Sequence, residues 1–317
     1  MKKFMSPIGA LATAVLASLA AAPAAASQAP PYTIAETGRS FSRLQDAVDA
    51  IGAGTGTIRF ASMRFADCAV QKAGDITYLA AVPGQSVLDG VACQGKAALV
   101  LDGRSARIEG LVFANIRVPD RNGAGIRLQR GNLTVLQSWF RDSEQGILTH
   151  NDKDSAITID KSTFTRLGTC EGSGGCAHSI YIGDYGSLTV TRSRFEQGRG
   201  GHYAKSRSGR VAISDTSFDD TGGRGTNYMI DLPNGATGTI AGNWFVQGRD
   251  KDNHSALIVV GAKKKWRSSD GLKIEGNDAR FAPGAERSSN FVVDFSGDRL
   301  VLRENKLAAH LKPLDRR

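Results

Sequence analysis

The sequence has few cysteines, few aromatic residues and, beyond its N-terminal region, no long apolar run. Its 317 residues include only four Cys, and Phe, Trp and Tyr together make up 7%. A membrane helix needs roughly 20 apolar residues in succession, so the chain after residue 26 is not expected to enter a membrane. No nucleotide-binding glycine motif, Ser-His-Asp arrangement or zinc-ligand spacing stands out. We therefore expect neither a cofactor nor a metal.

The N-terminus has the features of a secretory signal peptide. Two lysines precede an apolar run over residues 8–22, and small residues at 24–26 form an A-x-A cleavage site. We predict a signal peptide over residues 1–26 and a mature domain over residues 27–317 that is periplasmic or secreted. No Pro- or Ser-rich linker divides the mature chain, so one domain is expected.

The four cysteines form an even set in a chain predicted to be exported. An oxidising compartment favours disulfides, and the cysteine spacings do not match a zinc ribbon. The glycines of TCEGSGGC allow a small loop to close. We predict the pairs Cys68–Cys93 and Cys170–Cys176.

The charge of the chain indicates the chemistry of its partner. The formal net charge is +9, and removal of Lys2 and Lys3 with the leader leaves +7, without a dense polybasic tail. Such a surface favours anionic partners. Export and the scarcity of aromatic runs argue against nucleic acid. We therefore predict an acidic polysaccharide as the partner, and we expect a monomer.

An internal repeat extends through most of the mature chain. The segments LTVLQSWF, ITIDKSTF, LTVTRSRF, VAISDTSF and GTIAGNWF follow the approximate pattern apolar-x-apolar-x-x-Ser/Asn-x-Phe and begin 23 to 31 residues apart. A second series of short strands, including GIRLQ, GILTH and HSIYIG, lies between them. Periods of roughly 20 to 50 residues are typical of solenoids, and Gly, Asn and Asp suit their corners. The repeat predicts an all-β, right-handed parallel β-helix, a single-stranded solenoid, with at least eight turns over residues 57–307.

The same pattern predicts the core and the two ends. The Ser or Asn of each segment should form an internal polar ladder, beside a stack of Phe140, Phe164, Phe195, Phe218 and Phe245. Residues 41–51 have the spacing of an amphipathic helix directly before a first strand at residues 57–60, and this helix should cap the open end of the solenoid. The last dozen residues are expected to form a polar tail or cap.

Three consecutive turns concentrate cations, phenols and imidazoles. They are AHSIYIGDYG, GHYAKSRSGR and NYMIDLPNG, beginning at residues 177, 201 and 227. Matching positions of adjacent turns lie about 5 Å apart. Two columns follow: His178, His202 and Tyr228 beside Tyr181, Lys205 and Asp231. Positions three apart in a straight strand face opposite sides, so the columns share one groove only if the histidines lie in the loops that enter the strands. Otherwise the histidines point inward.

These turns resemble known proteins. The run HSIYIG, the GH-x-x-KSR turn and the Y-x-x-DLPNG turn resemble a group of exported bacterial right-handed parallel β-helix repeat proteins over residues 176–261. More distantly, YAKSRSG is similar to the lysine-serine turn of β-helical alginate and chondroitin lyases. That similarity implies Lys205 as the catalytic base, assisted by Arg224 or Arg207. The calcium-binding acidic residues of those lyases correspond here to His178 and His202, which argues against a calcium-dependent mechanism.

The residues themselves suit β-elimination from a uronate. That reaction needs a group that neutralises the carboxylate, a base that removes the adjacent proton and an acid that protonates the departing oxygen. Arg207 or His202, Lys205, and Tyr181 or Tyr228 fit these roles in that order. The predicted catalytic set is Lys205, Arg207, His202 and Tyr181. The predicted substrate-binding set is His178, Tyr203, Arg224, Tyr228, Asp231 and Asn234.

The predicted function is therefore a polysaccharide lyase acting on an acidic polysaccharide, with three alternatives. A uronate C5-epimerase would use nearly the same residues. A glycoside hydrolase needs two carboxylates roughly 5 to 9.5 Å apart, for which Asp184 and Asp231 are candidates. A non-catalytic protein would hold an anionic glycan through Lys205, Arg207 and the lysines at 263–265.

Overall fold

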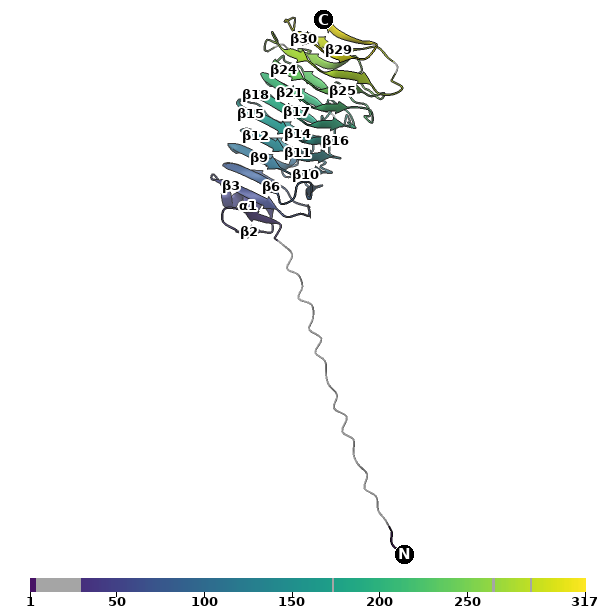
Figure 1. Cartoon of the computed structure of the whole chain (residues 1–317). Helices are drawn as coiled ribbons and strands as arrows, with labels where there is room; N and C mark the ends of the chain where they lie inside the picture. The colour runs from purple at the N-terminus through teal and green to yellow at the C-terminus, as the bar shows by residue number, and fades with distance from the viewer. Residues whose placement is uncertain (4–29, 173, 264–265, 286) are drawn as a thin grey trace.

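The chain is a solenoid of stacked parallel strands (Figure 1). The computed structural model describes residues 1–3, 30–172, 174–263, 266–285 and 287–317. Within these residues, three sheets of 12, 10 and 10 strands run along the molecule; we call them sheets A, B and C. Each full turn contributes one strand to every sheet, so the predicted all-β solenoid of at least eight turns is confirmed.

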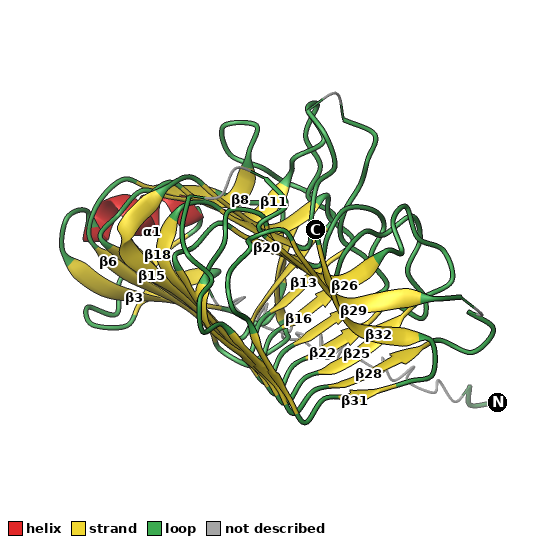
Figure 2. Cartoon of the chain, turned by 90° about the horizontal axis from the view of Figure 1, so that it is seen from above, coloured by secondary structure: helices red, strands yellow, loops and turns green. Residues whose placement is uncertain are grey.

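The strands of each sheet follow one another in chain order, except that β2 precedes β1 at the start of sheet A. Sheet A contains β2 (Ser40–Phe41), β1 (Tyr32–Ile34), β3 (Thr55–Phe60), β6 (Asp75–Ala80), β9 (Ser105–Glu109), β12 (Asn132–Leu136), β15 (Asp152–Asp160), β18 (Tyr185–Thr191), β21 (Arg210–Ser214), β24 (Thr237–Ala241), β27 (Lys273–Glu275) and β30 (Val301–Arg303). Sheet B contains β4 (Arg64–Phe65), β7 (Ser86–Asp89), β10 (Leu111–Ala114), β13 (Trp139–Arg141), β16 (Thr163–Thr165), β19 (Arg194–Glu196), β22 (Ser217–Asp219), β25 (Trp244–Gln247), β28 (Asp278–Phe281) and β31 (Lys306–Leu307). Sheet C contains β5 (Ala69–Gln71), β8 (Ala97–Leu101), β11 (Ala124–Leu128), β14 (Gln145–Thr149), β17 (Ile180–Ile182), β20 (Ala204–Ser206), β23 (Ile230–Leu232), β26 (Ala256–Val260), β29 (Ser289–Asp294) and β32 (Leu311–Arg316). In Figure 2 the strands β3, β6, β15 and β18 of sheet A lie apart from β22, β25, β28 and β31 of sheet B.

Each repeat segment bends at the corner between sheets A and B. In one turn β12 ends at Leu136, Gln137 has a φ of 45°, and β13 begins at Trp139. The equivalent corner residues of later turns also have positive φ: Lys161, Arg192, Asp215, Gly242, Gly276 and Glu304. A single residue in the left-handed region turns the chain sharply. Each repeat segment is therefore two strands joined by a sharp corner at this one left-handed residue.

The residue after each corner belongs to a buried polar ladder. The backbone N–H of Ser138 donates to Ser162 Oγ at 3.2 Å, and that of Ser162 donates to Ser193 Oγ at 3.1 Å. Near the C-terminus asparagines occupy the same position of the ladder. There the backbone N–H of Asn243 donates to Asn277 Oδ1 at 3.0 Å. These bonds satisfy backbone donors at corners where no strand partner is in reach. The predicted polar ladder is confirmed.

The predicted phenylalanine stack is also present, with one further member. Successive rings lie 4.6 to 5.0 Å apart with interplanar angles of at most 6°. Its members are Phe113, Phe140, Phe164, Phe195, Phe218 and Phe245, all fully buried. The ring spacing follows the spacing between neighbouring strands, so the backbone register fixes the stack.

Both ends of the solenoid differ in part from the sequence prediction. The helix α1 (Leu44–Ile51) packs Leu44, Ala47 and Val48 into the core, as a cap requires. The prediction that the first strand follows this helix is wrong, because β1 precedes α1 and pairs antiparallel with β2 and β3. At the other end β32 pairs in parallel with β29. The last residues thus form a strand that continues sheet C rather than a polar tail.

Two disulfides join the predicted cysteine pairs. Cys68 is bonded to Cys93, and Cys170 to Cys176. In the part of the chain that the structure describes, no helix has the length and apolar character needed to span a membrane. Residues 4–26 of the predicted signal peptide, residues 1–26, lie outside the described residues.

We expect Phe195→Ala to lower the free energy of unfolding by about 3–5 kcal/mol, because it removes a fully buried ring and leaves a cavity. Phe195 stacks on Phe164 at 4.6 Å and on Phe218 at 5.0 Å. Urea unfolding followed by circular dichroism measures the change. Phe195→Leu keeps most of the buried volume and should cost much less. Equal and small losses for both variants would contradict a packed ladder.

Candidate functional site

A repeated irregularity in sheet C brings the two predicted columns to one surface. The strands β17, β20 and β23 begin two residues after His178, His202 and Tyr228, which therefore lie in the entering loops. The next two residues of a turn both face the core, as Tyr203 and Ala204 show. Two consecutive inward side chains shift the alternation of the strand by one position. His202 and Lys205, three residues apart, consequently emerge on the same side.

The first column is a stack of three rings. His178 and His202 lie 4.8 Å apart at an interplanar angle of 23°, and His202 and Tyr228 lie 5.3 Å apart at 18°. The backbone N–H of His202 donates to His178 Nδ1 at 2.9 Å, and that of Tyr228 donates to His202 Nδ1 at 3.2 Å. A nitrogen that accepts a hydrogen bond carries no proton. Each histidine that is neutral therefore has its proton on Nε2.

The surroundings of the histidines keep them neutral. Burial lowers the pKa of His178 to about 3, and the charges of Lys205 and Lys263 act in the same direction. Burial also lowers the pKa of His202 well below its ordinary value, with further contributions from His178 and Lys205. A neutral imidazole cannot neutralise a substrate carboxylate by charge. Of the two candidates for that role, His202 is thus unsuitable and Arg207 remains.

The second column meets the first at one carboxylate oxygen. Tyr181, Lys205 and Asp231 occupy matching positions of neighbouring strands. Lys205 Nζ lies 3.4 Å from Asp231 Oδ2, and His202 Nε2 lies 3.3 Å from the same oxygen. Burial raises the pKa of Asp231, although Lys205 opposes this rise. Asp231 therefore fixes Lys205 and His202 relative to each other.

Tyr181 lies against two cations. The Nε–H of Arg207 donates to the Tyr181 hydroxyl at 2.9 Å. Lys205 Nζ lies 5.3 Å from the centre of the Tyr181 ring, and the guanidinium of Arg207 lies 5.7 Å from it. Tyr181 and Arg207 are partly exposed, whereas Lys205 is 7% exposed. The outer rim of this cluster is thus a phenol and a guanidinium, with the ammonium behind them.

A loop from a later turn reaches back over the cluster. It joins β26 to β27, and its Arg267 donates from Nη1 to the carbonyl oxygen of Arg207 at 2.8 Å and pairs with Asp184. Trp266 from the same loop lies 5.8 Å from the guanidinium of Arg207. Sequence reasoning missed these two residues, and the only signal for them was the dense run KKKWR. Lys264 and Lys265 of that run lie outside the described residues.

Three predicted substrate-binding residues lie elsewhere or serve another purpose. The prediction for Tyr203 is wrong, because its side chain is buried in the core and its hydroxyl donates to Asp220 at 2.6 Å. Asn234 is buried and accepts a hydrogen bond from Arg207, so it positions that arginine. Arg224 is exposed on the loop between β22 and β23.

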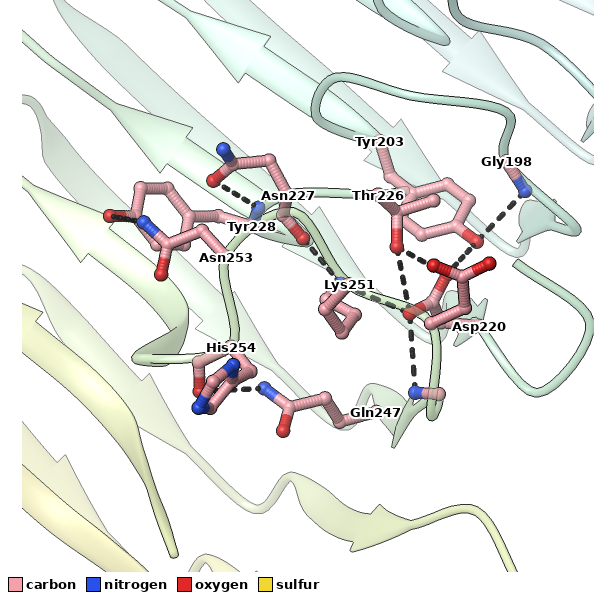
Figure 3. Close-up of polar contacts among 12 residues, drawn as sticks. Gly198, Tyr203, Asp220, Thr226, Asn227, Tyr228, Gln247, Lys251, Asn253 and His254 are labelled. Atoms are coloured by element: carbon pink, nitrogen blue, oxygen red, sulfur yellow. Dashed lines mark hydrogen bonds and ion pairs between the residues drawn. The ribbon is translucent and has the colours of Figure 1, made fainter. Parts of the chain in front are cut away.

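Lys251 and Asp220 form a buried ion pair next to the loop that carries Tyr228 (Figure 3). Lys251 Nζ is 3.0 Å from Asp220 Oδ2, and the two side chains are 1% and 0% exposed. Asp220 also accepts hydrogen bonds from the hydroxyls of Tyr203 and Thr226 at 2.6 and 2.8 Å and from the Gly248 N–H at 3.2 Å. Such a set of partners compensates for much of the cost of removing the charges from water.

The ion pair holds the loops that carry the ring stack. Lys251 donates to the carbonyl oxygen of Asn227, the residue before Tyr228. Asp220 binds Tyr203, the residue after His202. The Tyr228 hydroxyl in turn accepts a hydrogen bond from Asn253 Nδ2 at 2.8 Å. Sequence reasoning did not identify this network, because its members are spread over three turns.

The cluster as a whole is suited to binding an anion. Arg207, Lys205 and Lys263 bring three cations near one carboxylate, Asp231, while both histidines are neutral. An excess of positive charge in one cluster is stabilised by an anionic ligand. Among the described residues, no group of three or more His, Cys, Asp or Glu side chains is placed to hold a metal ion.

The fold and its repeats define a right-handed parallel β-helix protein. The chain belongs to the family described as right handed beta helix region, whose model matches residues 96–279. The structure is similar to that of an alginate lyase from Paenibacillus sp. str. FPU-7, with 15% identity, a TM-score of 0.60, and 85% of this chain and 96% of that chain covered. It is also similar to ORF18 of Geobacillus virus E2, with 14% identity and a TM-score of 0.56. That match covers 86% of this chain and 56% of the viral chain. No curated protein matches the sequence.

We expect Lys251→Met to lower the free energy of unfolding by about 3–5 kcal/mol, because it leaves the buried Asp220 carboxylate without its cation. Chemical denaturation measures this loss. The double variant Asp220→Asn/Lys251→Met removes both charges and should recover part of it. Arg299→Met, which breaks an exposed pair with Asp270, is the matched control and should change little. A single variant as stable as this control would contradict the assigned role.

The neutral histidines predict a dependence of stability on pH. The pKa of His178 is lowered from 6.5 to about 3 in the folded protein, so the unfolded chain binds the proton first as the pH falls. The free energy of unfolding should therefore decrease as the pH is lowered from about 6.5 towards 3. His178→Asn retains an acceptor for the His202 N–H and should show a shallower decrease in urea titrations. Parallel curves would contradict a buried, neutral His178.

Proposed function

We propose that the protein is a polysaccharide lyase that cleaves an acidic polysaccharide by β-elimination. The observation that carries the proposal is the contact of Lys205, Tyr181 and Arg207 on the outer face of sheet C. These are the residue types that the reaction needs, and they lie within reach of one bound sugar. The similarity in fold to an alginate lyase is in accord with this proposal.

Each residue has one task in the proposed reaction. Arg207 binds the uronate carboxylate and stabilises the negative charge that develops there. Lys205, as the neutral amine, removes the proton from the carbon next to the carboxylate. The electrons of that C–H bond form a carbon–carbon double bond, and the bond to the glycosidic oxygen breaks. Tyr181 donates its proton to the departing oxygen and is then reprotonated from solvent.

Lys205 must lose a proton before it can act as a base, and Asp231 is placed to accept it. The two groups are 3.4 Å apart, and burial raises the pKa of Asp231. In a site that excludes water, the neutral pair of amine and carboxylic acid costs less desolvation than the ion pair. A substrate that covers the site promotes this transfer. Asp231 thereby acts as a positioning residue and as the proton acceptor for Lys205.

The alternatives differ in products or in the groups available. A C5-epimerase would use the same base but return a proton to the same carbon, so the chain length would not change. A hydrolase is disfavoured because Asp184 is paired with Arg267 and Asp231 with Lys205. A binding protein would show affinity without turnover.

We also infer that the protein acts outside the cytoplasm. All four cysteines are paired in disulfides, which persist in oxidising compartments. A high-molecular-weight acidic polysaccharide is a substrate that an exported enzyme would meet there.

The test is a panel of acidic polysaccharides incubated with the protein, with formation of unsaturated ends followed by ultraviolet absorbance. We expect turnover of at least one polymer. Lys205→Ala should lower kcat by roughly 10²- to 10⁴-fold while weakening substrate binding only modestly, because the base acts in the transition state. Lys273→Ala, an exposed cation on sheet A, is the control and should retain activity. Saturable binding without absorbance change or new reducing ends would refute the lyase proposal.

A further inference from the structure

A cavity lies on the outer face of sheet C, near the N-terminal end of the column formed by Tyr181, Lys205 and Asp231. Its volume is about 170 Å³, and it is lined by Gly95, Lys96, Asp120, Asn122, Arg127 and Leu148. Arg127 pairs in register with Leu148, Leu148 with Tyr181, and Tyr181 with Lys205. The cavity and the proposed catalytic cluster therefore share one column of side chains.

We propose that this cavity is a second binding subsite, which holds another carboxylate-bearing sugar of the same acidic chain that is bound at Lys205. The proposal rests on the proposed function and extends it, because it specifies a linear polymer with recurring carboxylates as the substrate. Arg127 and Lys96 would bind the carboxylate, and Asn122 would hydrogen-bond to sugar hydroxyls.

The geometry sets the direction of the bound chain. Arg127 and Lys205 are three strand positions apart, which corresponds to roughly 14 Å along the solenoid. A polymer that contacts both residues must cross the strands and run along the solenoid axis. Leu148 lies between the two charged positions and offers an apolar surface to the carbon–hydrogen face of a sugar ring.

The charges of the cavity favour an anion. Lys96 and Arg127 supply two cations against the single carboxylate of Asp120. Arg127 is half-buried, and burial lowers its pKa, while Asp120 acts in the opposite direction. A partly desolvated guanidinium gains more from a bidentate carboxylate than an exposed one does. Asp120 competes with the substrate for this cation, so its removal should strengthen binding.

The experiment compares long and short substrates. We expect Arg127→Ala to lower kcat/KM on the polymer by about tenfold or more and to leave kcat/KM on the shortest cleaved oligosaccharide unchanged. Asp120→Asn should raise kcat/KM on the polymer. Arg107→Ala removes an exposed cation from sheet A, where it pairs with Glu109, and should match the wild type on both substrates. Wild-type activity of Arg127→Ala on the polymer, or the same loss on both substrates, would overturn the subsite.

Affinity electrophoresis of the intact polymer separates this inference from the proposed reaction. If the wild type cleaves none of the polymers, the lyase proposal fails, and the subsite is judged by affinity alone. Arg127→Ala must then bind the polymer at least several-fold more weakly than Arg107→Ala does. Equal affinity of these two variants would overturn the subsite in that case also.

Discussion

The structure depends on the register of its parallel strands. Hydrogen bonding between turns places equivalent positions at the strand spacing, so any residue type that recurs in the sequence becomes a column in space. The phenylalanine stack, the Ser/Asn ladder and the His178–His202–Tyr228 stack are three results of this one constraint. The column that joins Arg127 to Asp231 is a fourth.

The site exists because sheet C departs from strict alternation. Where Tyr203 and Ala204 both face the core, the turn presents an imidazole and an ammonium on one side instead of on opposite sides. The buried pair of Asp220 and Lys251 holds the loops at this point. A buried ion pair contributes little net stability compared with apolar packing, so its value here lies in fixing the loop geometry.

The electrostatics of the cluster distinguish it from an ordinary basic surface. Burial keeps both histidines neutral and raises the pKa of Asp231. The cations Lys205 and Arg207 therefore have few counter-charges nearby, and both lie close to the Tyr181 ring. The similarity to an alginate lyase, at 15% identity, is a similarity of fold alone. The proposed reaction thus rests on these side chains rather than on that likeness.

The sequence alone was enough to predict the features that recur along the chain and those set by residues close together in sequence. The period of the segments was enough to predict the solenoid, the phenylalanine and polar ladders and the two columns. The number and spacing of the cysteines were enough to predict both disulfides. The repeat period could not show which residues face outward after the irregularity in sheet C, so Tyr203 was wrongly predicted to bind substrate. Only the tertiary structure placed Arg267 beside Asp184, 83 residues away in sequence, and Lys251 beside Asp220. A periodic pattern predicts the position of a residue within its turn. Contacts between side chains of distant turns depend on loop conformations and burial, which no local pattern encodes.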